Sequence, residues 1–592
     1  MRKVFLCFWL FLTLGFTNSA MGQSWDIGHN PVQGGNYLPN VTATLNQTTG
    51  ILTISGNGNM ADFWCTGDNQ YGTGGEAPWW FNEVRLAINF VVIEGGVQNI
   101  GMRAFKDCSN LKTVTIPSSV NNINGQAFFY CSSLHTVIIE NGAGNLEFRG
   151  YRSSNPCGTS GTINTYDWFE GCTSLTNLHL GRNLTNWYAS SDNRSPIFNI
   201  RTILTTLTIG NTVTSIGSAA FNNCSSLKNV EIQDGTVLLT FSGTYSNGHF
   251  KNSPIETLVL GRNLRTTASG YNGYPFAENP ALKTLTVSDY VKDINDNSFY
   301  NCTGLQSLTI IGNELRTIGS NAFYGCSSLA SVLNIPQGVS SIGSGAFQGC
   351  LALPSVSIPN SVTSIGSTAF NNCSSLKNVE IQDGTVLLTF SGTYSNGHFK
   401  NSPIETLVLG RNLRTTASGY NGYPFAENSS LKTLTIGNDV TIINANGFLN
   451  CTGLMQITSP CPPTIQSTTF NGVNKDIPVY IDCNNCLTAY RTAQFWNEFT
   501  NYWDIDTQER CELGIEDITS SQFVIYPNPT TGELRIENGE LRIEEVEIFD
   551  IYGKKLLSHN SNLINISHLS AGIYFVKIRT EAGEITRKIL KK

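Results

Sequence analysis

The stretch FNNCSSLKNVEI occupies residues 221–232, and the same twelve letters return at residues 370–381. Its central element is an apolar or aromatic residue, then Cys three residues later, then Leu after three more. The cysteines found in this phrase are Cys108, Cys131, Cys172, Cys224, Cys302, Cys326, Cys350, Cys373 and Cys451. Copies without cysteine include HFKNSPIETLVL at residues 249–260 and PFAENPALKTLTV at residues 275–287. Repetition on this scale indicates a structural unit.

The Leu-x-x-Val-x-Ile part of the phrase is predicted to form short strands of one parallel sheet. The strands start near residues 111, 134, 175, 204, 227, 255, 282, 305, 329, 353, 376, 404, 431 and 454. Their spacings are mostly 23–24 or 27–29 residues, with one gap of 41. A period of about 20–30 residues with such strands is typical of a leucine-rich solenoid. We therefore predict a mainly β fold, a leucine-rich-repeat β-solenoid of about 14 coils followed by a small antiparallel β-sandwich.

Each position of the phrase has an expected place in a coil. Leu227, Val230 and Ile232 are expected to point inward, which leaves Asn229 and Glu231 on the outer face of the sheet. The Phe is expected to fill the space between coils, and the Cys to occupy a narrow column for a small apolar side chain. A nucleophilic cysteine needs a positioned base, and no His or Asp recurs in register with these thiols. We predict that the repeat thiols are buried, unpaired and structural.

Residues 1–22 have the features of a secretory signal peptide. Two basic residues precede a run of 13 mostly apolar residues at positions 4–16, and the small residues Ala20 and Gly22 precede an expected cut before Gln23. Such a run is too short for a membrane span, and no later segment approaches about 18 apolar residues. The sequence therefore predicts an exported chain without a membrane-spanning segment.

The composition is low in charge, with 13% charged and 40% hydrophobic residues and a net charge of −7 over 592 residues. A chain of this length exceeds one hydrophobic core, so several domains or an elongated repeat array are expected. The balance of charges gives no reason to expect nucleic acid as a partner. We expect a monomer that holds no cofactor and no metal.

Residues 212–279 and 361–428 are near-copies that match at 66 of 68 positions. Packing alone would not keep loop residues identical, so the pair is interpreted as a recent duplication. An array that grows by duplication of its units is suited to an extended contact surface more than to a single fixed binding site.

The wording I-G-x-x-A-F-x-x-C-S-S-L, found at residues 216–227, 318–329 and 365–376, resembles the BspA-like, Treponema-type leucine-rich-repeat family of bacterial surface proteins. The resemblance covers roughly residues 91–470. It implies adhesion or surface interaction, often with host proteins or other cells, and no enzymatic activity.

The expected domain limits follow from that resemblance and from the composition. They are a signal peptide at 1–22, a β-rich N-terminal cap at 23–86, the solenoid at 87–474, a terminal cap and linker at 475–514, and a separate module at 515–592.

The C-terminal module differs in composition from the rest. Residues 515–592 contain 10 Lys+Arg and 11 Asp+Glu, about 27%, against about 11% for residues 23–514. Short alternating strands between Gly and Pro-Asn turns predict a small antiparallel β-sandwich. The phrases YPNPTTGEL, VEIFDIYGKKL and INISHLSAGIYFVKI resemble the C-terminal sorting domain of the type IX (Por) secretion system. This resemblance implies the type IX machinery as a partner and a place at the outer-membrane surface or outside the cell. An independent domain of immunoglobulin type is the alternative.

The outer face of the predicted sheet is rich in hydroxyl groups. Its candidate ligand contacts are Thr113, Thr115, Thr206 and Thr208. Threonine also favours strands and keeps a sheet soluble, so a purely structural strip is the competing interpretation. The alternative contacts are aromatic residues in inserted loops, because Tyr and Trp offer large contact areas at low entropic cost. These are Trp187, Tyr188, Tyr245, Tyr271, Tyr274, Tyr394, Tyr420 and Tyr423.

Cys483-x-x-Cys486 is the one motif with redox or metal character. A zinc site would need two further ligands at matching spacing, and a redox motif would need a βαβ setting. A structural disulfide among Cys461, Cys483 and Cys486 is expected in an exported chain, with free thiols as the alternative. His249 and His398 occupy the same place in the two copies and are interpreted as loop-filling residues.

No catalytic phrase such as G-x-S-x-G, H-E-x-x-H or a Walker loop occurs in the sequence. We therefore predict a secreted or surface-displayed protein, not an enzyme, that mediates adhesion or interaction with a host or bacterial surface macromolecule, protein or glycan. A structural cell-surface component without a specific ligand is the alternative, and an uncharacterised hydrolase is a more distant one.

Overall fold

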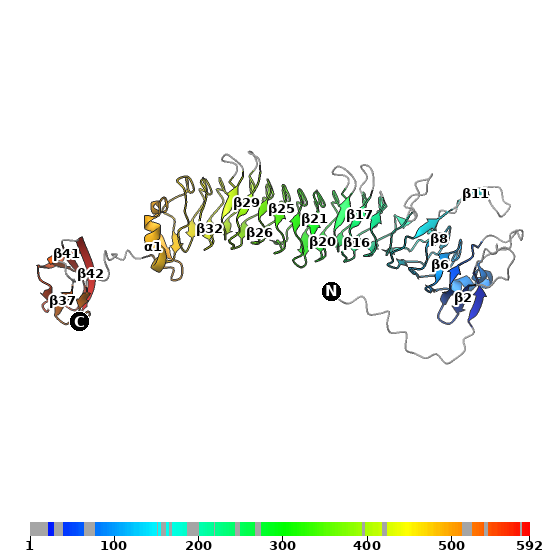
Figure 1. Ribbon diagram of the computed structural model, residues 1–592, viewed down its shortest axis with the longest axis horizontal. Coiled ribbons are helices and arrows are strands. Elements are labelled where there is room, and N and C mark those ends of the chain that lie inside the picture. The colour runs from blue at the N-terminus through cyan, green and yellow to red at the C-terminus, as the bar shows by residue number, and fades with distance from the viewer. Residues whose placement is uncertain are drawn as a thin grey trace. The chain divides into compact units, whose positions relative to one another are not determined.

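The structure is a computed structural model, and the chain forms two compact units, Met1–Asp506 and Thr507–Lys592 (Figure 1). The described residues are 22–28, 40–63, 77–150, 152–154, 162–164, 168–185, 200–217, 220–242, 249–266, 274–392, 397–416, 423–511, 524–537, 543–580 and 583–592. The predicted signal peptide, apart from residue 22, lies outside them.

The first unit is a stack of coils whose central strands form two long sheets. The first sheet has 12 strands, antiparallel from β1 to β3 and parallel from β3 onward. Its strands are β1 (Gln23–Asp26), β2 (Val41–Asn46), β3 (Ile51–Gly56), β5 (Phe90–Ile93), β7 (Thr113–Ile116), β9 (Thr136–Ile139), β13 (Asn177–Leu180), β14 (Thr206–Ile209), β16 (Asn229–Ile232), β18 (Thr257–Leu260), β20 (Thr284–Val287) and β22 (Ser307–Ile310). The second sheet has eight strands, β24 (Leu333–Asn334), β26 (Ser355–Ile358), β28 (Asn378–Ile381), β30 (Thr406–Leu409), β32 (Thr433–Ile436), β33 (Gln456–Thr458), β34 (Val479–Ile481) and β35 (Tyr502–Asp504).

A second row of short parallel strands runs along the returning side of the coils. It comprises β4 (Gly58–Asn59), β6 (Val97–Ile100), β8 (Asn122–Asn124) and β10 (Glu147–Arg149), then β15 (Ser215–Ile216), β17 (Leu239–Phe241) and β19 (Leu264–Thr266), then β21 (Asp293–Ile294), β23 (Thr317–Ile318), β25 (Ser341–Ile342), β27 (Ser364–Ile365), β29 (Leu388–Phe390) and β31 (Leu413–Thr415). A separate antiparallel pair, β11 (Arg152–Ser154) and β12 (Thr162–Asn164), lies within the long gap between repeats. The predicted β-solenoid of about 14 coils is confirmed.

The long sheet divides in two between β22 and β24 for a reason visible in the sequence. The segment LASVLNI at residues 329–335 has one residue more between its first and last apolar positions than LPSVSI at residues 353–358. Leu333 and Ile335 stay buried, and the extra residue leaves Val332 exposed. Leu333 then pairs with Val356 of the next coil, while β22 has no strand partner on this side among the described residues.

The strand pattern follows the expected alternation, because side chains along a strand point to opposite faces. In β16, Val230 and Ile232 are buried while Asn229 and Glu231 are exposed. The register is maintained from coil to coil, so that Val230 lies between Leu207 of β14 and Leu258 of β18.

Aromatic rings form a continuous buried column beside the sheets. From Phe221 to Phe470, each ring stacks on the next at centroid distances of 5.0–6.2 Å. A tryptophan lies at each end of the unit's aromatic core. Trp79, in the 3-10 helix η2 (Pro78–Ala87), stacks on Phe105, and Trp496, in the 3-10 helix η6 (Trp496–Glu498), contacts Phe470.

The end of the first unit contains a helix that the sequence reasoning did not predict, α1 (Cys483–Thr492). Asp482 caps it by accepting a hydrogen bond from the backbone N–H of Asn485. Such a cap satisfies an N–H group that the first helical turn leaves without a partner. The helix buries Cys486 and Tyr490, one turn apart, against the last coil.

The second unit is a β-sandwich, as predicted. One antiparallel sheet contains β36 (Val524–Tyr526), β37 (Glu533–Glu537) and β40 (Leu563–Asn565). The other contains β39 (Lys555–His559), β38 (Ile543–Phe549), β41 (Gly572–Thr580) and β42 (Gly583–Lys591). Inward residues of both sheets, among them Leu534, Ile564, Val546, Val576 and Ile589, form one buried cluster.

Candidate ligand-binding surface

The nine repeat cysteines form a buried column, and all of them are free thiols, as predicted. The column has a second property that the sequence did not show. Seven of the nine thiols donate a hydrogen bond to the carbonyl oxygen of a Phe in the preceding coil, for example Cys350 to Phe323 at 3.4 Å. Where Cys is replaced, the substitute also donates, as Ser253 does to Phe221 at 2.7 Å. The position therefore requires a small side chain that can donate a hydrogen bond.

The thiols of this column are poorly suited to chemistry. Burial raises the pKa of Cys302, Cys373 and Cys451 to about 12 in each case. A thiol with such a pKa stays protonated at neutral pH, and the thiolate is the reactive form. The column therefore has a structural role in the coils.

Two coils have a shorter turn than the others. In a regular coil, six positions separate the stacked Phe from the first apolar residue of the strand, as between Phe221 and Leu227. In HFKNSPIETLVL only five separate Phe250 from Ile255, and the copy repeats this between Phe399 and Ile404. We call residues 249–260 and 398–409 the short-turn coils.

The missing residue leaves a hollow of about 480 Å³ at the edge of the stack beside the first short-turn coil. Ser225 of the preceding coil and Pro280 and Ala281 of the following coil border it, since their turns keep the normal length. The remaining lining residues are Phe250, Lys251, Asn252, Ser253, Pro254, Tyr274, Pro275, Ala277, Glu278 and Asn279.

A matching hollow of about 480 Å³ lies beside the second short-turn coil. Its lining residues are Ser374, Gly397, Phe399, Lys400, Asn401, Ser402, Pro403, Tyr423, Pro424, Ala426, Glu427, Asn428, Ser429 and Ser430. The two linings differ in residue type only where Ser429 and Ser430 stand in place of Pro280 and Ala281. We call the pair the twin hollows.

Several polar groups of the twin hollows are uncommitted. Among the described residues, none forms a hydrogen bond or ion pair with the Lys251 amine, the Glu278 carboxylate or the Tyr274 hydroxyl. Lys251 and Glu278 are exposed, and Tyr274 is half-buried. Asn252 is held in place, because its amide donates to Asn223 at 2.8 Å. Its backbone lies in the left-handed region with φ of 59°, which Asn tolerates better than most residues. Each hollow therefore presents free donors and acceptors on a fixed backbone.

An ion-pair ladder lies on the strand that follows each short turn. Glu256 contacts Lys228 of the coil before at 3.2 Å and Lys283 of the coil after at 2.6 Å. Glu405 makes the same pair of contacts in the copy, and the hydrogen bonds from its two lysines lower its pKa to about 2. Each ladder joins three successive coils through one carboxylate and two amines.

A buried arginine ties three coils together in each copy. Arg262, fully buried, donates to the backbone oxygens of Gly210 and Asn211, both at 2.7 Å and two coils away. Arg411 and Arg182 make equivalent bonds, so a Gly-Arg-Asn phrase marks each site. Sequence reasoning missed these residues, because an arginine in a loop is normally exposed.

The predicted threonine strip is present on the outer face, and its four residues are half-buried. Thr113 and Thr206 belong to one cross-strand column, in which every outward residue from β7 to β22 is Thr, Asn or Ser. Thr115 and Thr208 belong to a second column that is interrupted by Ile138, His179, Glu231 and Val259 on neighbouring strands. The first column is a continuous polar row, whereas the second is mixed.

The aromatic candidates divide into two groups. Tyr274 and Tyr423 are half-buried and line the twin hollows. The others lie outside the described residues, namely Trp187, Tyr188, Tyr245, Tyr271, Tyr394 and Tyr420. His249 and His398 are buried, and each ring packs edge-on against a Phe and forms a hydrogen bond with a backbone carbonyl, consistent with a filling role.

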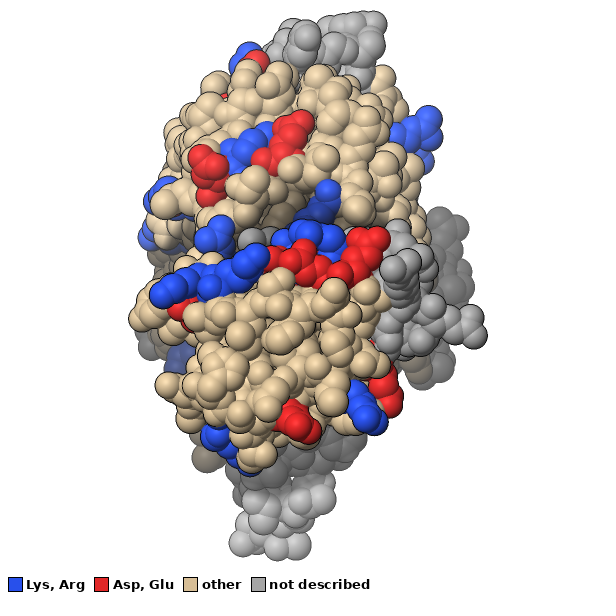
Figure 2. Space-filling view, turned by 90° about the vertical axis from the view of Figure 1, so that its left-hand side faces the viewer, with Lys and Arg blue, Asp and Glu red and all other residues tan. Residues whose placement is uncertain are grey.

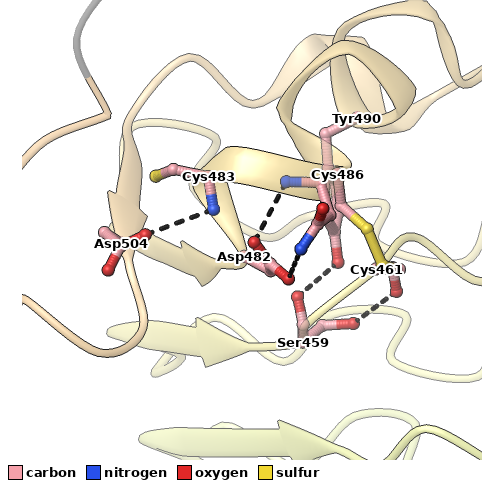
Figure 3. Close-up of a disulfide and its surroundings, with 8 residues drawn as sticks. Ser459, Cys461, Asp482, Cys483, Cys486, Tyr490 and Asp504 are labelled. Carbon is pink, nitrogen blue, oxygen red and sulfur yellow. Dashed lines mark hydrogen bonds between the residues drawn. A yellow bond between two sulfur atoms is a disulfide. The ribbon is translucent and has the colours of Figure 1, made fainter.

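The Cys-x-x-Cys motif lies at the start of α1 and forms disulfides (Figure 3). Cys461 pairs with Cys486, and Cys483 and Cys511 are also disulfide-bonded. Beside the Cys461–Cys486 bridge, the Tyr490 hydroxyl donates to the carbonyl of Ser459 at 2.8 Å. The motif therefore locks the helix to the last coil. No cluster of three possible metal ligands occurs among the described residues.

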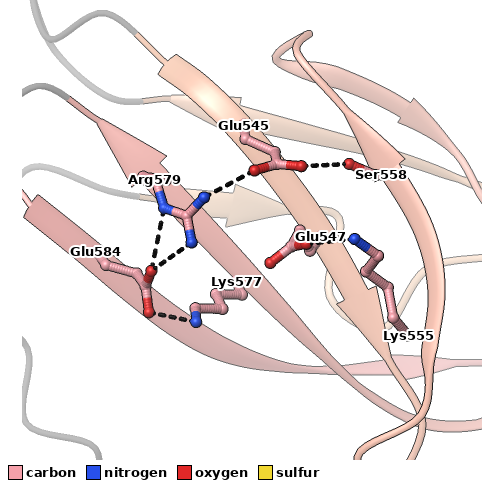
Figure 4. A network of polar contacts seen from close by, with 7 residues as sticks. All are labelled: Glu545, Glu547, Lys555, Ser558, Lys577, Arg579 and Glu584. Carbon is pink, nitrogen blue, oxygen red and sulfur yellow. Dashed lines mark hydrogen bonds and ion pairs between the residues drawn. The ribbon is translucent and has the colours of Figure 1, made fainter.

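Charged side chains of the C-terminal module form ion pairs between neighbouring strands of one sheet (Figure 4). Arg579 contacts Glu545 at 2.9 Å and Glu584 at 3.0 Å, while Lys555 pairs with Glu547 at 2.7 Å. Cross-strand pairs of opposite charge stabilise a sheet modestly. Figure 2 shows the same mixing on a larger scale, since acidic and basic side chains lie next to each other and most of the visible face is uncharged.

Comparisons with known proteins agree with both predicted resemblances. The sequence model of the BspA type leucine rich repeat region matches six times, over residues 80–191, 157–271, 194–329, 271–389, 340–477 and 420–512. The model of the secretion system C-terminal sorting domain matches residues 524–592. No curated protein sequence matches the chain. No helix among the described residues is long and apolar enough to cross a membrane.

Several similar solved structures are leucine-rich repeat proteins from bacteria. One is a leucine-rich repeat protein from Bacteroides ovatus, at 19% identity over 79% of this chain and 98% of that chain, with a TM-score of 0.27. Another is a leucine-rich repeat protein from Eubacterium ventriosum, at 17% identity over 76% and 95%, with a TM-score of 0.22. A third is a leucine rich cell surface protein from Faecalibacterium prausnitzii, at 20% identity over 62% and 95%, with a TM-score of 0.19.

Proposed function

Because this chain belongs to the BspA-type leucine-rich repeat family, we propose that it is an adhesion or interaction protein, which binds a surface macromolecule without transforming it. The sorting domain at residues 524–592 indicates export by the type IX secretion machinery and attachment at the cell surface. The ligand is a host or bacterial surface macromolecule, and the protein acts as a monomer.

The observation that carries the proposal is the pair of twin hollows. Each one is a concave site of the size that ligands occupy, and most binding pockets measure about 300–1,000 Å³. Each presents a tyrosine and uncommitted polar groups, which are common at binding surfaces. The regular coils between them lack the short turn. The proposed binding sites therefore lie at the two coils whose turn is one residue shorter than in the regular coils.

A binding screen tests the proposal. The full-length protein is presented to immobilised host matrix proteins, glycans and bacterial surface polymers, and saturable binding to one of them is expected. The double variant Tyr274→Ala/Tyr423→Ala should weaken that binding at least tenfold, because it removes the ring from both hollows.

The matched control is Tyr130→Ala/Tyr290→Ala, since both tyrosines are 50% exposed and lie outside the hollows. Equal loss in the control and the hollow variant would contradict the assignment of the hollows. No binding to any probe would favour a structural surface component, and turnover of a probe would contradict both.

Export is tested separately by deleting residues 515–592. The truncated chain should stay in the periplasm of a host that has the type IX machinery, because it lacks the sorting domain. Fractionation of the cells and detection of the solenoid measure this. Normal surface display of the truncated protein would overturn the role of the domain.

The remaining predicted contacts stay predictions. The continuous row that contains Thr113 and Thr206 could extend a contact onto the flat face of the sheet, and Thr115 and Thr208 lie beside it. The predicted signal peptide at residues 1–22 would supply the first step of export.

A further inference from the structure

The twin hollows are two copies of one site on one rigid stack. Their linings agree in all but two neighbouring positions, and their polar groups are the same, with Tyr274, Lys251 and Glu278 matched by Tyr423, Lys400 and Glu427. Because the two sites have nearly the same lining, each is expected to bind one copy of the same chemical unit. A ligand that fills both at once must itself be a repeating polymer.

The distance between the hollows is fixed by the coils. Strands β16 and β28 hold equivalent places in the two copies, and β18, β20, β22, β24 and β26 lie between them, which makes six coil steps. At about 4.8 Å per step the hollows are about 29 Å apart. In Figure 1 the equivalent strands β17 and β29 lie along the same edge of the stack, so the two copies have the same orientation within it.

The unbroken aromatic column keeps this distance constant. Every ring from Phe221 to Phe399 stacks on its neighbour, across all the coils that separate the hollows. Close-packed interiors of this kind have low compressibility, so the stacked coils resist shortening. The spacing is therefore a property that a ligand can match.

The lining indicates the chemistry of the repeating unit. Lys251 and Glu278 carry opposite charges and do not pair with each other, so the hollow favours neither an anionic nor a cationic ligand. The Lys251 amine and the Tyr274 hydroxyl can donate, and the Glu278 carboxylate can accept. Pro254, Pro275 and Ala277 add an apolar wall. An uncharged ring with hydroxyl groups at its rim and C–H groups on its face fits this combination.

We propose that the twin hollows bind two separate units of one neutral polysaccharide chain at the same time. The proposal rests on the binding function proposed above and adds the ligand class and the bivalent mode. When one hollow is occupied, the second binds a unit of the same chain at a high local concentration. Such linkage raises affinity by about 10²–10⁴ over a single site, provided that the ligand spans the distance.

The experiment compares long and short neutral glycans on the full-length protein. Amylose, mannan and arabinogalactan are used as long chains, and tetrasaccharides prepared from each serve as short ones. Calorimetry is expected to show two equal sites for the short form of the bound glycan. The long form should bind at least a hundredfold more tightly.

Single and double variants separate the bivalent mode from simple binding. Tyr274→Ala or Tyr423→Ala alone should reduce long-chain affinity to the level of the tetrasaccharide, while leaving one site for the short form. The double variant should lose both. A second design inserts one serine between Pro254 and Ile255 and another between Pro403 and Ile404, which restores the normal turn length and fills both hollows. Circular dichroism melting verifies that each variant is folded.

The outcomes distinguish this proposal from the binding function itself. Equal affinity for long and short glycans, or no effect of the single variants on the long form, would overturn the bivalent mode. Saturable binding to a matrix protein with no binding to any glycan would overturn the ligand class and leave the interaction function standing. Binding that persists after both serine insertions would show that the hollows are not the site.

Discussion

The regular coil at residues 346–358 and the short-turn coil at residues 249–260 share one frame and differ by one residue in the turn. Both place a Phe in the buried column, and both place a donor three residues later, Cys350 in the one and Ser253 in the other. The turn of the short-turn coil lines a hollow. The buried column therefore fixes the fold, and the turn is the part of the repeat that can change in length while the fold is kept.

Loss of an aromatic ring should have the largest effect and should be the same in both coils. Phe347→Ala and Phe250→Ala each remove a buried ring from the column, and such changes cost about 3–5 kcal/mol. Hydrogen exchange of the backbone amides should report that the free energy of opening falls by this amount around the altered coil. Phe347→Leu is the control, with a smaller loss. A clear difference between the two coils would show that they do not share one frame.

Loss of the buried arginine should destabilise the short-turn coil, whereas the regular coil at residues 346–358 has no equivalent arginine to lose. Arg262→Met leaves the carbonyl oxygens of Gly210 and Asn211 without their donor, and an unpaired buried group costs about 1–3 kcal/mol. We expect a total of about 2–4 kcal/mol in the same exchange measurement. Arg265→Met is the matched control, because Arg265 is exposed, and it should change little. An equal effect of both variants would remove the special role of Arg262.

Replacement of the cysteine should test whether the column needs a donor or only a small side chain. Cys350→Ala leaves the carbonyl of Phe323 without its thiol donor and opens a small cavity, at a cost of about 1–2 kcal/mol. Cys350→Ser keeps the donor, as Ser253 does in the other coil, and should cost less than half of that. If Ser proved as costly as Ala, the hydrogen bond would contribute nothing and the column would be apolar, as the sequence alone indicates.

The ion-pair ladder should have the smallest effect, and its sign depends on pH. Glu405 is paired with Lys377 and Lys432, which lower its pKa to about 2, below the usual value of about 4.3. Its contribution to stability is therefore present above about pH 4.3 and is lost as the pH falls toward 2. Thermal unfolding of Glu405→Gln should start slightly below the unaltered protein at pH 6 and converge with it at pH 2. A difference that grows on acidification would contradict the assignment.

Much of the frame could be predicted from the sequence, because each feature depends on a local pattern that repeats. The alternation around Val230 placed its neighbours on the outer face, and the Phe of each phrase was expected between coils. The helix α1 was not predicted, since CNNCLTAYRT is short and only its contact with the last coil makes Cys486 and Tyr490 a buried face.

The candidate site could be predicted only in part. Tyr274 and Tyr423 were named as contacts, but Lys251, Asn252 and Glu278 were not, because nothing in the sequence brought them together with the tyrosines. The available signal was the spacing of five instead of six between Phe250 and Ile255. The shorter spacing indicates a hollow only once the neighbouring coils, which keep a spacing of six residues, are known to stack on either side.

The period, the buried column, the polar outer positions and the separate C-terminal module could be predicted from the sequence, because each depends on residues that are close together in the chain. The tertiary structure alone decided the hollows, the pairing of Cys461 with Cys486, the burial of Arg262 and the bond from each thiol to the coil before it. All of these depend on what lies one or two coils away, as with the 25 residues between Cys461 and Cys486 and the 52 between Arg262 and Gly210. A side chain in a solenoid has its partners in the neighbouring coils, and only stacking brings them within reach.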